Sequence, residues 1–451
     1  MKVNDEKLVL LAQKLNKPLY IVGGYVRNNC IDENAYTDID LASTYTYDEL
    51  LPTLEEAGYF VVACYKRTGS IVFSDGKNNY EYTRFRKETY DAGGVHSPNK
   101  VEPTNDIKQD ALRRDFKCNA VYYDIKNDKI VDVLGGIADI KNKVLCTVKE
   151  PEQVFKNDGL RLMRLARLSG ELDFSPSADV LAAAKKYSDN ILGITVERIF
   201  DELKKILIAE EKYTFSNKDG HYKGLLILSA TGVLDYILPE LTLGRDMAQR
   251  KDYHKYDVLE HSLRCVKYAD KSVRLAALLH DIGKPYCKIH YGEFHGHEEE
   301  GKRIAANVLK RLKADNETKK RVLFLVGAHM KDLNLDMKTT KLRKFIVDNY
   351  EYIGDLLKLK QADYRASKDS DGVSPYVIKW QKLIEQMHSD GTPFSVKDLK
   401  ISAKDLMELG FKDKAIGKEL KKLFNIAVLT PQKNNFSALH KIALKDIQKA
   451  N

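Results

Sequence analysis

The sequence predicts an α+β protein, with a mixed sheet near the N-terminus and helices through the rest of the chain. Short apolar segments separated by polar turns recur over residues 1–145 and are typical of strands. From residue 146 onward, apolar residues recur at the three-to-four-residue spacing of helices, as in Val154–Leu172 and Glu197–Ala209. The first region is therefore expected to hold the sheet, and the remainder to form all-helical domains.

The expected strands lie near 19–23, 37–42, 60–63, 71–73, 80–86 and 117–123. Segment 91–110 is rich in Gly, Pro and Asn and is predicted to be a mobile loop. Because 451 residues exceed the usual size of one hydrophobic core, several domains are expected. The pattern divides the chain into 1–145, 146–245, 246–385 (rich in histidine) and 386–451 (rich in lysine).

Composition predicts a cytoplasmic protein that binds a polyanion. No apolar run approaches the ~20 residues that span a bilayer, and the N-terminus lacks the apolar core of a signal peptide. Six scattered cysteines lack Cys-x-x-Cys spacing, which argues against structural zinc and for reduced thiols. The net charge is +9, and residues 391–451 carry 12 lysines against 6 acidic residues, which favours nucleic acid as the partner. A helical domain with lysine-rich faces is the alternative explanation of this tail.

The first motif suits chemistry on a nucleoside triphosphate. Gly23 and Gly24 end an apolar run and allow the backbone to approach phosphate, because no Cβ is in the way. Arg27 offers a fixed fork of donors to phosphate oxygens. Asp38 and Asp40 alternate along an expected strand, so both carboxylates point to one face, as a Mg²⁺ site requires. A solvated turn is the alternative for Asp-x-Asp alone.

A third carboxylate follows on the next pair of expected strands. Residues 71–73 and 80–86 look like paired strands, and Glu81 faces away from the tyrosines on either side of it. A sheet that places Glu81 beside Asp38 and Asp40 would give three carboxylates around two metals about 3.5–4 Å apart. A solvent-facing position on an amphipathic strand is the alternative for Glu81.

Two further motifs could select the nucleotide. Arg113, Arg114 and Asp115 are expected at the start of a strand, where Arg114 could reach triphosphate and Asp115 could accept from a ribose hydroxyl. Downstream, a carboxylate and three arginines recur at spacing three on one face of an expected helix, namely Asp158, Arg161, Arg164 and Arg167. A carboxylate accepts from cytosine N4 or adenine N6 and a guanidinium donates to ring acceptors, so such a pair could distinguish base edges. Surface ion pairs are the alternative for both motifs.

Histidines and aspartates form a separate constellation in the third region. The set is His261, the His280-Asp281 doublet and Asp363, with His297 and His329 as candidates for a second metal. Neutral imidazoles with carboxylates suit a transition metal such as Ni²⁺, Mn²⁺, Fe²⁺ or Zn²⁺ better than Mg²⁺ alone. A histidine satisfied within the core is the alternative for any one of these residues. As a set they resemble the metal site of HD domains, which implies phosphohydrolysis by a phosphatase or cyclic-nucleotide phosphodiesterase.

Six motifs in one order resemble the class II nucleotidyltransferases, specifically the bacterial CCA-adding tRNA nucleotidyltransferases and their relatives the poly(A) polymerases. They are Gly-Gly-Tyr-Val-Arg, Thr-Asp-Ile-Asp-Leu, Tyr-Glu-Tyr-Thr-Arg-Phe-Arg, and residues 112–120, 155–168 and 196–203. The resemblance implies a catalytic head (1–145), a nucleotide-selecting and RNA-binding neck (146–245), an HD domain (246–385) and a tRNA-binding tail (386–451). Asn119 belongs to the motif that handles ribose and phosphate.

The implied reaction is addition of C, C and A from CTP and ATP to the 3′ end of tRNA, with Asp38 and Asp40 holding two Mg²⁺ ions and Glu81 completing the site. Alternatives that share these motifs are a poly(A) polymerase and an enzyme adding only C or only A. A further alternative is an RNA-binding HD phosphohydrolase with an inactive transferase. Two departures bear on these choices: Asn28 and Asn157 replace an aspartate and a glutamate that are usual in the family. The sequence indicates no oligomeric state.

Overall fold

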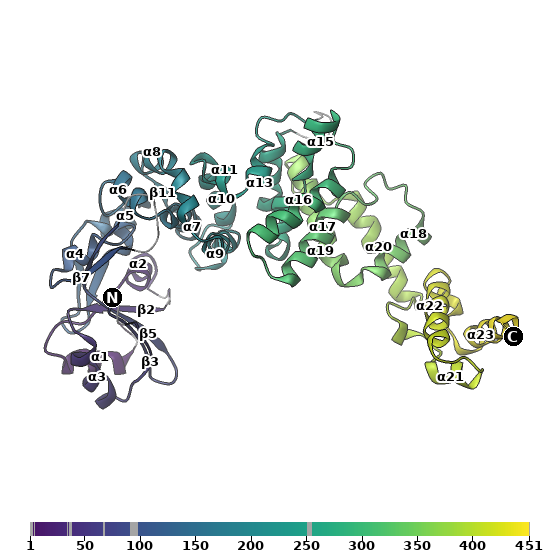
Figure 1. Cartoon of the computed structure of the whole chain (residues 1–451), viewed down its shortest axis with the longest axis horizontal. Helices are drawn as coiled ribbons and strands as arrows, with labels where there is room; N and C mark the ends of the chain where they lie inside the picture. The colour runs from purple at the N-terminus through teal and green to yellow at the C-terminus, as the bar shows by residue number, and fades with distance from the viewer. Residues whose placement is uncertain are drawn as a thin grey trace. The chain divides into compact units, whose positions relative to one another are not determined.

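A seven-stranded mixed sheet forms the centre of the N-terminal region in this computed structural model, which describes residues 3, 5–33, 35, 38–65, 68–90, 98–249 and 255–450 (Figure 1). The strands are β1 (Tyr20–Val22), β2 (Ile39–Ser43), β3 (Phe60–Tyr65), β4 (Ser70–Ser74), β5 (Asn79–Arg84), β8 (Val121–Asp124) and β9 (Lys129–Asp132). Their order across the sheet is β3-β4-β5-β2-β1-β8-β9. Only β2 and β5 run parallel, and the other neighbours are antiparallel. The α+β class predicted from sequence is confirmed.

Helices and two small ladders accompany this sheet. The helices are α1 (Glu6–Lys14), α2 (Gly24–Ile31), α3 (Tyr47–Glu56), α4 (Ile107–Ala111) and α5 (Gly136–Asn142). The ladders pair β6 (Arg86–Thr89) with β7 (Lys100–Pro103), and β10 (Val144–Leu145) with β11 (Ser175–Pro176). A cluster of buried side chains between the sheet and its helices includes Val22, Ala42, Phe85 and Tyr122. This core fixes the strand ends from which the acidic residues project.

Two local expectations are wrong. Residues 117–119 form a short 3₁₀ helix, so the last predicted strand starts only at Val121 and Arg113–Asp115 precede it in a turn. The predicted loop 91–110 contains β7 and α4, because Asp106 caps α4 by accepting from the Lys108 N–H at 2.8 Å. Residues 91–97 of that prediction lie outside the described residues.

Helices build the rest of the first half of the chain. They are α6 (Pro151–Asn157), α7 (Leu160–Leu172), α8 (Ala178–Lys186), α9 (Val196–Ile206), α10 (Gly220–Ala230), α11 (Val233–Ile237) and α12 (Pro239–Thr242). The single helix predicted over Val154–Leu172 is two helices. Asp158 has an extended backbone and its Oδ1 accepts from the Leu160 N–H at 2.9 Å, which ends α6 and starts α7. A local side-chain bond of this kind competes with helix continuation.

The described residues of the second half of the chain form helices joined by loops. Its helices are α13 (Val258–Tyr268), α14 (Arg274–Leu279), α15 (Gly283–Tyr291), α16 (His297–Arg311), α17 (Asn316–Ala328), α18 (Thr339–Asp348), α19 (Tyr350–Lys368), α20 (Pro375–Ser389), α21 (Ala403–Glu408), α22 (Lys414–Leu429) and α23 (Phe436–Ala450). A separate small core that includes Leu406, Leu423 and Leu439 holds the last three helices together. Among the described residues, no helix is long and apolar enough to cross a membrane.

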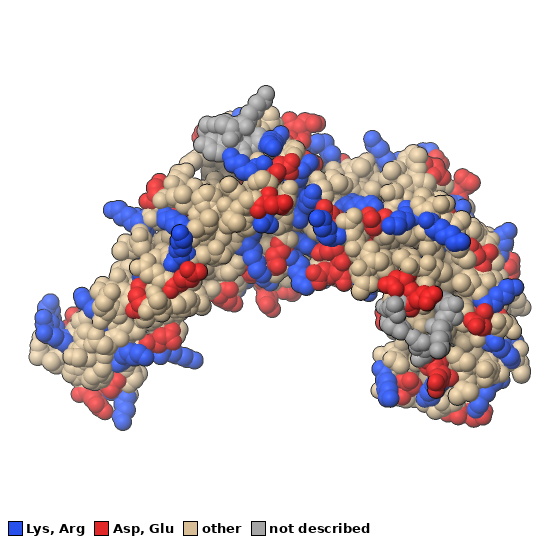
Figure 2. All heavy atoms as spheres, turned by 180° about the vertical axis from the view of Figure 1, so that it is seen from behind, with Lys and Arg blue, Asp and Glu red and all other residues tan. Residues whose placement is uncertain are grey.

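The chain packs as two compact units. The first comprises Met1–Thr242 with Val308–Ala314, and the second comprises Leu243–Asn307 with Asp315–Asn451. The finer division into four domains stays a prediction. All six cysteines are free thiols, as their spacing predicts. On the face shown in Figure 2, basic side chains are interspersed with acidic ones rather than gathered in one patch.

Candidate active sites

The first unit contains a cavity of about 740 Å³ lined mainly by polar and charged side chains. Its wall combines sequence-predicted residues with others that sequence reasoning missed. The predicted ones are Gly23, Gly24, Arg27, Asp40, Arg113, Arg114, Asp115, Asn119, Asp158, Arg161, Arg164 and Arg167. The missed ones include Arg86, Glu88, Tyr90, Glu171, Arg198, Lys212 and Tyr213. Residues from the sheet and from the following helices thus meet around one space.

Strand register brings two of the predicted carboxylates together. Asp40 on β2 lies directly opposite Glu81 on the parallel strand β5. Displacement of water by the surrounding protein raises the pKa of Asp40 to about 6, although the residue keeps an exposed edge. The Glu81 and Asp38 charges add to this increase, and the Arg114 guanidinium opposes it. Asp38 is exposed and stands one residue before β2.

Gly23 allows the backbone to pass close to this carboxylate. It has φ +81°, and a Cβ there would lie 3.5 Å from Oδ2 of Asp40 and 3.9 Å from Nη1 of Arg114. Glycine populates such positive φ values without the cost that other residues incur. The N-terminus of α2 therefore begins beside the acidic pair. A divalent cation fits this donor set, because it would stabilise the Asp40 carboxylate, whose pKa is raised mainly by burial and further by the Glu81 and Asp38 charges.

Asp110 anchors the two arginines of the second motif and was missed from sequence. It is fully buried, and its Oδ1 accepts from Nε of Arg113 at 2.7 Å. Its Oδ2 accepts from Nη2 of Arg114 at 3.2 Å and from the Tyr122 hydroxyl at 2.7 Å. The arginine charges hold the pKa of Asp110 below its usual value despite burial. The spacing Asp110-x-x-Arg113-Arg114 is a helical i,i+3 and i,i+4 pattern that could have identified it.

We expect Asp110→Asn to impair the nucleotide addition that the sequence resemblance implies, while leaving the fold intact. An amide would put an NH₂ group against the cations that one carboxylate now holds, so Arg114 should lose its position in the cavity. The expected result is a ~10- to 100-fold lower kcat/KM and about 1–3 kcal/mol less stability, measured by nucleotide incorporation and urea unfolding. Asp106→Asn is the matched control on the same helix, because Asn caps a helix as well as Asp. Equal activity of both variants would contradict the role of Asp110 in holding Arg114 in the cavity.

A chain of hydrogen bonds joins the first motif to the third. Arg27 donates through Nη1 to Oδ1 of Asn119 at 2.5 Å, and Nδ2 of Asn119 donates to Oδ1 of Asp115 at 3.0 Å. Oδ2 of Asp115 accepts from Nε of Arg164 on α7 at 2.7 Å. Burial acts to raise the pKa of Asp115. The Arg164 charge is the largest of the influences that lower it, and the pKa of Asp115 lies well below its usual range. Asp115 therefore links the sheet region to α7 and is not an isolated acceptor for ribose.

Asp158 and Arg161, the pair predicted to distinguish base edges, lie just before α7 and in its first turn, respectively. Nε of Arg161 is 3.6 Å from Oδ2 of Asp158, and Nη2 of Arg161 donates to the Arg113 carbonyl at 2.7 Å. Burial raises the pKa of Asp158 to about 6, with Arg161 opposing the increase. Arg167 instead pairs with Glu171 and Glu202, at 3.1 and 2.7 Å. Arg161 therefore remains beside Asp158, whereas Arg167 is held away from it.

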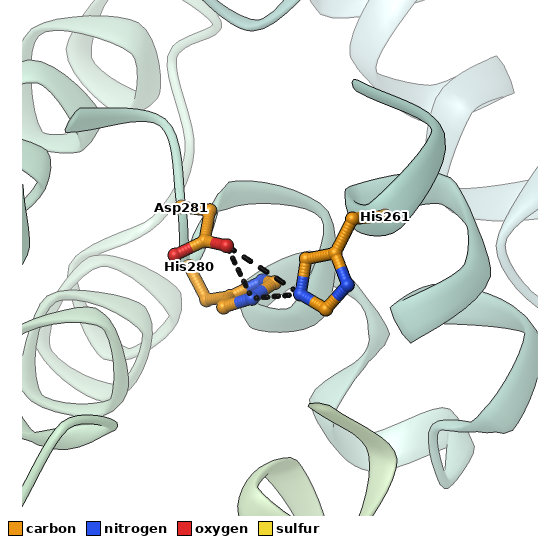
Figure 3. A group of neighbouring side chains, drawn as sticks. All are labelled: His261, His280 and Asp281. Atoms are coloured by element: carbon orange, nitrogen blue, oxygen red, sulfur yellow. Dashed lines mark hydrogen bonds and ion pairs between the residues drawn. The ribbon is translucent and has the colours of Figure 1, made fainter. Parts of the chain in front are cut away.

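The second unit brings the predicted histidines and aspartates into one buried cluster. Nε2 of His261 on α13 lies 3.3 Å from Nε2 of His280 and 3.0 Å from Oδ1 of Asp363 on α19. Figure 3 shows His261, His280 and Asp281 converging, with Oδ2 of Asp281 3.2 Å from Nε2 of His280. Burial is the main reason that the pKa of His261 is lowered, which favours the neutral imidazole that a metal binds.

Asp281 also faces a second pair of imidazoles. Its Oδ1 lies 3.2 Å from Nε2 of His297 and 3.5 Å from Nε2 of His329. His280, His297 and His329 each place Nδ1 at 2.6–2.8 Å from a carbonyl three residues earlier, which leaves Nε2 toward the cluster. Burial lowers the pKa of His329 to about 4. The cluster thus contains two triads that share Asp281: one with His261 and His280, the other with His297 and His329. Within each triad the ligand atoms lie within 4.8 Å of one another, and this donor set fits one or two divalent metals.

Close backbone packing and a buried lysine hold this cluster. Gly283 packs so tightly that a Cβ would come within 2.1 Å of the His297 carbonyl oxygen. Lys360, on the helix that carries Asp363, is 1% exposed and donates to the carbonyls of His329 and Lys331 at 2.8 and 2.5 Å. Sequence reasoning missed Lys360, since nothing local marks a lysine that bonds backbone carbonyls about thirty residues away.

Comparisons with known proteins match several parts of the chain to known domains. Residues 19–146 match the poly A polymerase head domain, 173–243 the probable RNA and SrmB-binding site of polymerase A, and 252–353 the HD domain. An A-adding tRNA nucleotidyltransferase of Deinococcus radiodurans is 30% identical over 339 residues, which are 70% of this chain and 74% of that protein. The chain belongs to the class II nucleotidyltransferases. Within them, it is a member of the tRNA nucleotidyltransferase and poly(A) polymerase family.

Other class II nucleotidyltransferases support this assignment. A multifunctional CCA protein of Chromobacterium violaceum is 30% identical over 309 residues, 66% of this chain and 71% of that protein. The structure of the Bacillus stearothermophilus CCA-adding enzyme in complex with CTP superposes with a TM-score of 0.68 at 20% identity, covering 100% of this chain and 99% of that one. That likeness shows the shared fold. The family is metal-dependent, in keeping with the donor sets of both sites.

Proposed function

We propose that the chain adds C, C and A to the 3′ end of tRNA, using CTP and ATP without a nucleic-acid template. The observation that carries this proposal is the cavity in which the Asp40–Glu81 pair and the Asp158–Arg161 pair line or adjoin one space. One pair suits phosphoryl chemistry and the other suits recognition of a base edge. The named relatives that add A or CCA to tRNA support the same reaction class.

In the proposed mechanism the RNA 3′-hydroxyl attacks the α-phosphorus of the nucleotide, and pyrophosphate leaves. Asp38 and Asp40 would hold Mg²⁺, with Glu81 as a ligand or orienting group. Bound Mg²⁺ supplies charge stabilisation and lowers the pKa of the attacking hydroxyl. Arg27 and Arg114 would bind the phosphates, and their fixed positions reduce the reorganisation needed in the transition state.

We assign base selection to Asp158, just before α7, and to Arg161 in the first turn of that helix. Above about pH 6 the Asp158 side chain is a carboxylate and can accept from cytosine N4 or adenine N6. Arg161 is held by the Arg113 carbonyl and donates toward a ring acceptor of the same base. Asn157, where the family usually has glutamate, ends α6 and leaves Asp158 as the carboxylate of the pair.

Products of RNA extension test this function and its alternatives. Transcripts of tRNA ending before C, after CC and after CCA, with an unrelated RNA, are incubated with Mg²⁺ and CTP, ATP or both. Stepwise addition of C, C and A that then stops, on tRNA only, is the expected result. A long A ladder on any RNA indicates a poly(A) polymerase, and C alone or A alone indicates an enzyme with one part of the reaction. No extension contradicts the transferase proposal.

We propose a second activity, phosphohydrolysis, for the histidine–aspartate cluster. A shared carboxylate between two imidazole pairs is suited to two divalent transition metals, which would activate water against a phosphate ester. Nζ of Lys284 lies 2.6 Å from Oδ2 of Asp281 and places an ammonium group beside the cluster. Phosphomonoesters and cyclic nucleotides are the substrate classes to assay.

A further inference from the structure

Arg27 is a buried guanidinium whose hydrogen-bond partners among the described residues are all neutral. It is 3% exposed and lines the cavity of the first unit. Its Nε and Nη2 donate to Oδ1 of Asn28 at 2.9 and 2.7 Å, and its Nη1 donates to Asn119 at 2.5 Å. Nη2 also donates to the Tyr213 hydroxyl at 3.0 Å. None of these partners carries charge, whereas a guanidinium stays protonated.

Most other arginines of the cavity wall have an acidic partner. The pairs are Arg86 with Glu88, Arg113 and Arg114 with Asp110, Arg161 with Asp158, Arg164 with Asp115, and Arg167 with Glu171 and Glu202. Arg198, which is exposed, is the exception among the described residues. A carboxylate beside a paired arginine offsets part or all of its charge within the protein, although Arg113 and Arg114 share Asp110. The buried charge of Arg27 instead needs an anion from outside the protein.

Asn28 is the residue that leaves this charge uncompensated. It is fully buried, and its single side-chain oxygen accepts from both Nε and Nη2 of Arg27. Its Nδ2 has no hydrogen-bond partner among the described residues. An aspartate at this position, as is usual in the family, would accept from the same two N–H groups and offset the Arg27 charge.

We propose that Asn28 sets the affinity of the site for polyphosphate. By holding Arg27 with a neutral amide, it makes the triphosphate of the incoming nucleotide, and then the leaving pyrophosphate, the counter-ion of Arg27. The effect is independent of the base, so it applies equally to CTP and ATP. This inference rests on the proposed transferase function.

The test compares Asn28→Asp with Asn29→Asp by calorimetric titration of Mg²⁺-CTP, Mg²⁺-ATP and pyrophosphate in the absence of RNA. Asn29 lies on the same helix but its Nδ2 donates to the Tyr25 carbonyl, and it does not line the cavity. We expect Asn28→Asp to weaken binding of all three ligands about tenfold, the order of a charge-assisted contact, and to leave tRNA affinity unchanged. Its ligand-free Tm should rise while its nucleotide-induced Tm shift falls, a combination that loss of packing does not produce.

Equal affinities of Asn28→Asp and the wild type would overturn the inference, as would an equal loss in Asn29→Asp, which would indicate a general charge effect. Binding of nucleotide by the wild type keeps the transferase proposal in place in both cases. If the wild type binds neither nucleotide nor pyrophosphate, the transferase proposal fails together with the inference.

Discussion

Asp40→Asn is expected to abolish RNA extension, with a loss of at least ~10³-fold in kcat. The substitution keeps the size of the side chain but removes the charge that lies opposite Glu81 across the strand pair. With one carboxylate fewer, the mutual repulsion that a divalent cation would relieve is weakened, and so is the affinity for that cation. Single-turnover extension of a tRNA transcript at increasing Mg²⁺ measures the effect, and excess Mg²⁺ should restore activity only in part.

Asp48→Asn is the matched control for this experiment. Asp48 is an exposed carboxylate in the first turn of α3, a few residues beyond the same strand. The Asp48→Asn variant should extend RNA at the wild-type rate. Near-normal extension by Asp40→Asn would mean that the chemistry takes place elsewhere. Loss of phosphohydrolysis along with extension would indicate unfolding rather than a local defect.

Asp281→Asn is expected to remove bound metal and phosphohydrolysis together while sparing RNA extension. Its two oxygens face different imidazole pairs, so one substitution weakens both triads at once. We expect the metal content of the second unit to fall by more than half and hydrolysis of p-nitrophenyl phosphate and of a cyclic nucleotide to fall at least ~100-fold. Elemental analysis of the purified protein and initial-rate assays provide the two readouts.

Asp315→Asn is the control for that variant. Asp315 caps α17, the helix that leads to His329, and Asn serves equally well at a cap. This control should keep its metal and its activity. Unchanged metal content in Asp281→Asn would contradict the assignment of the cluster as a metal site. Loss of metal with full hydrolysis would contradict its proposed activity.

The parts of the first site that follow from strand alternation could be predicted from sequence. Successive side chains along a strand point to opposite faces, and this alternation can be read from the local sequence. Asp40 and Glu81 could therefore be predicted as site residues before the pairing of their strands was known. The HD set could also be recognised, because the His280-Asp281 doublet follows an apolar run. The distances among these groups depend on which strands and helices become neighbours, and sequence spacing does not determine that.

The partners of the arginines could not be predicted in the same way. Arg27 bonds Tyr213, which lies 186 residues away, and Arg164 bonds Asp115, which lies 49 residues away. Such pairs exist only after α7 and its neighbours have packed against the sheet region. The predicted helix through Asp158 failed for a related reason. Its side chain bonds a backbone N–H two residues on, an option that the apolar periodicity of the segment does not reveal.

Mass spectrometry of an intact tRNA product measures directly which nucleotides the protein adds. A transcript ending before CCA is incubated with CTP, ATP and Mg²⁺ and weighed after the wild-type, Asp40→Asn and Asp158→Ala proteins have acted. We expect a mass increase of two C and one A residue with the wild type, no increase with Asp40→Asn, and incomplete or incorrect additions with Asp158→Ala. The same three-residue increase with Asp40→Asn, or no increase with the wild type, would contradict the proposed function.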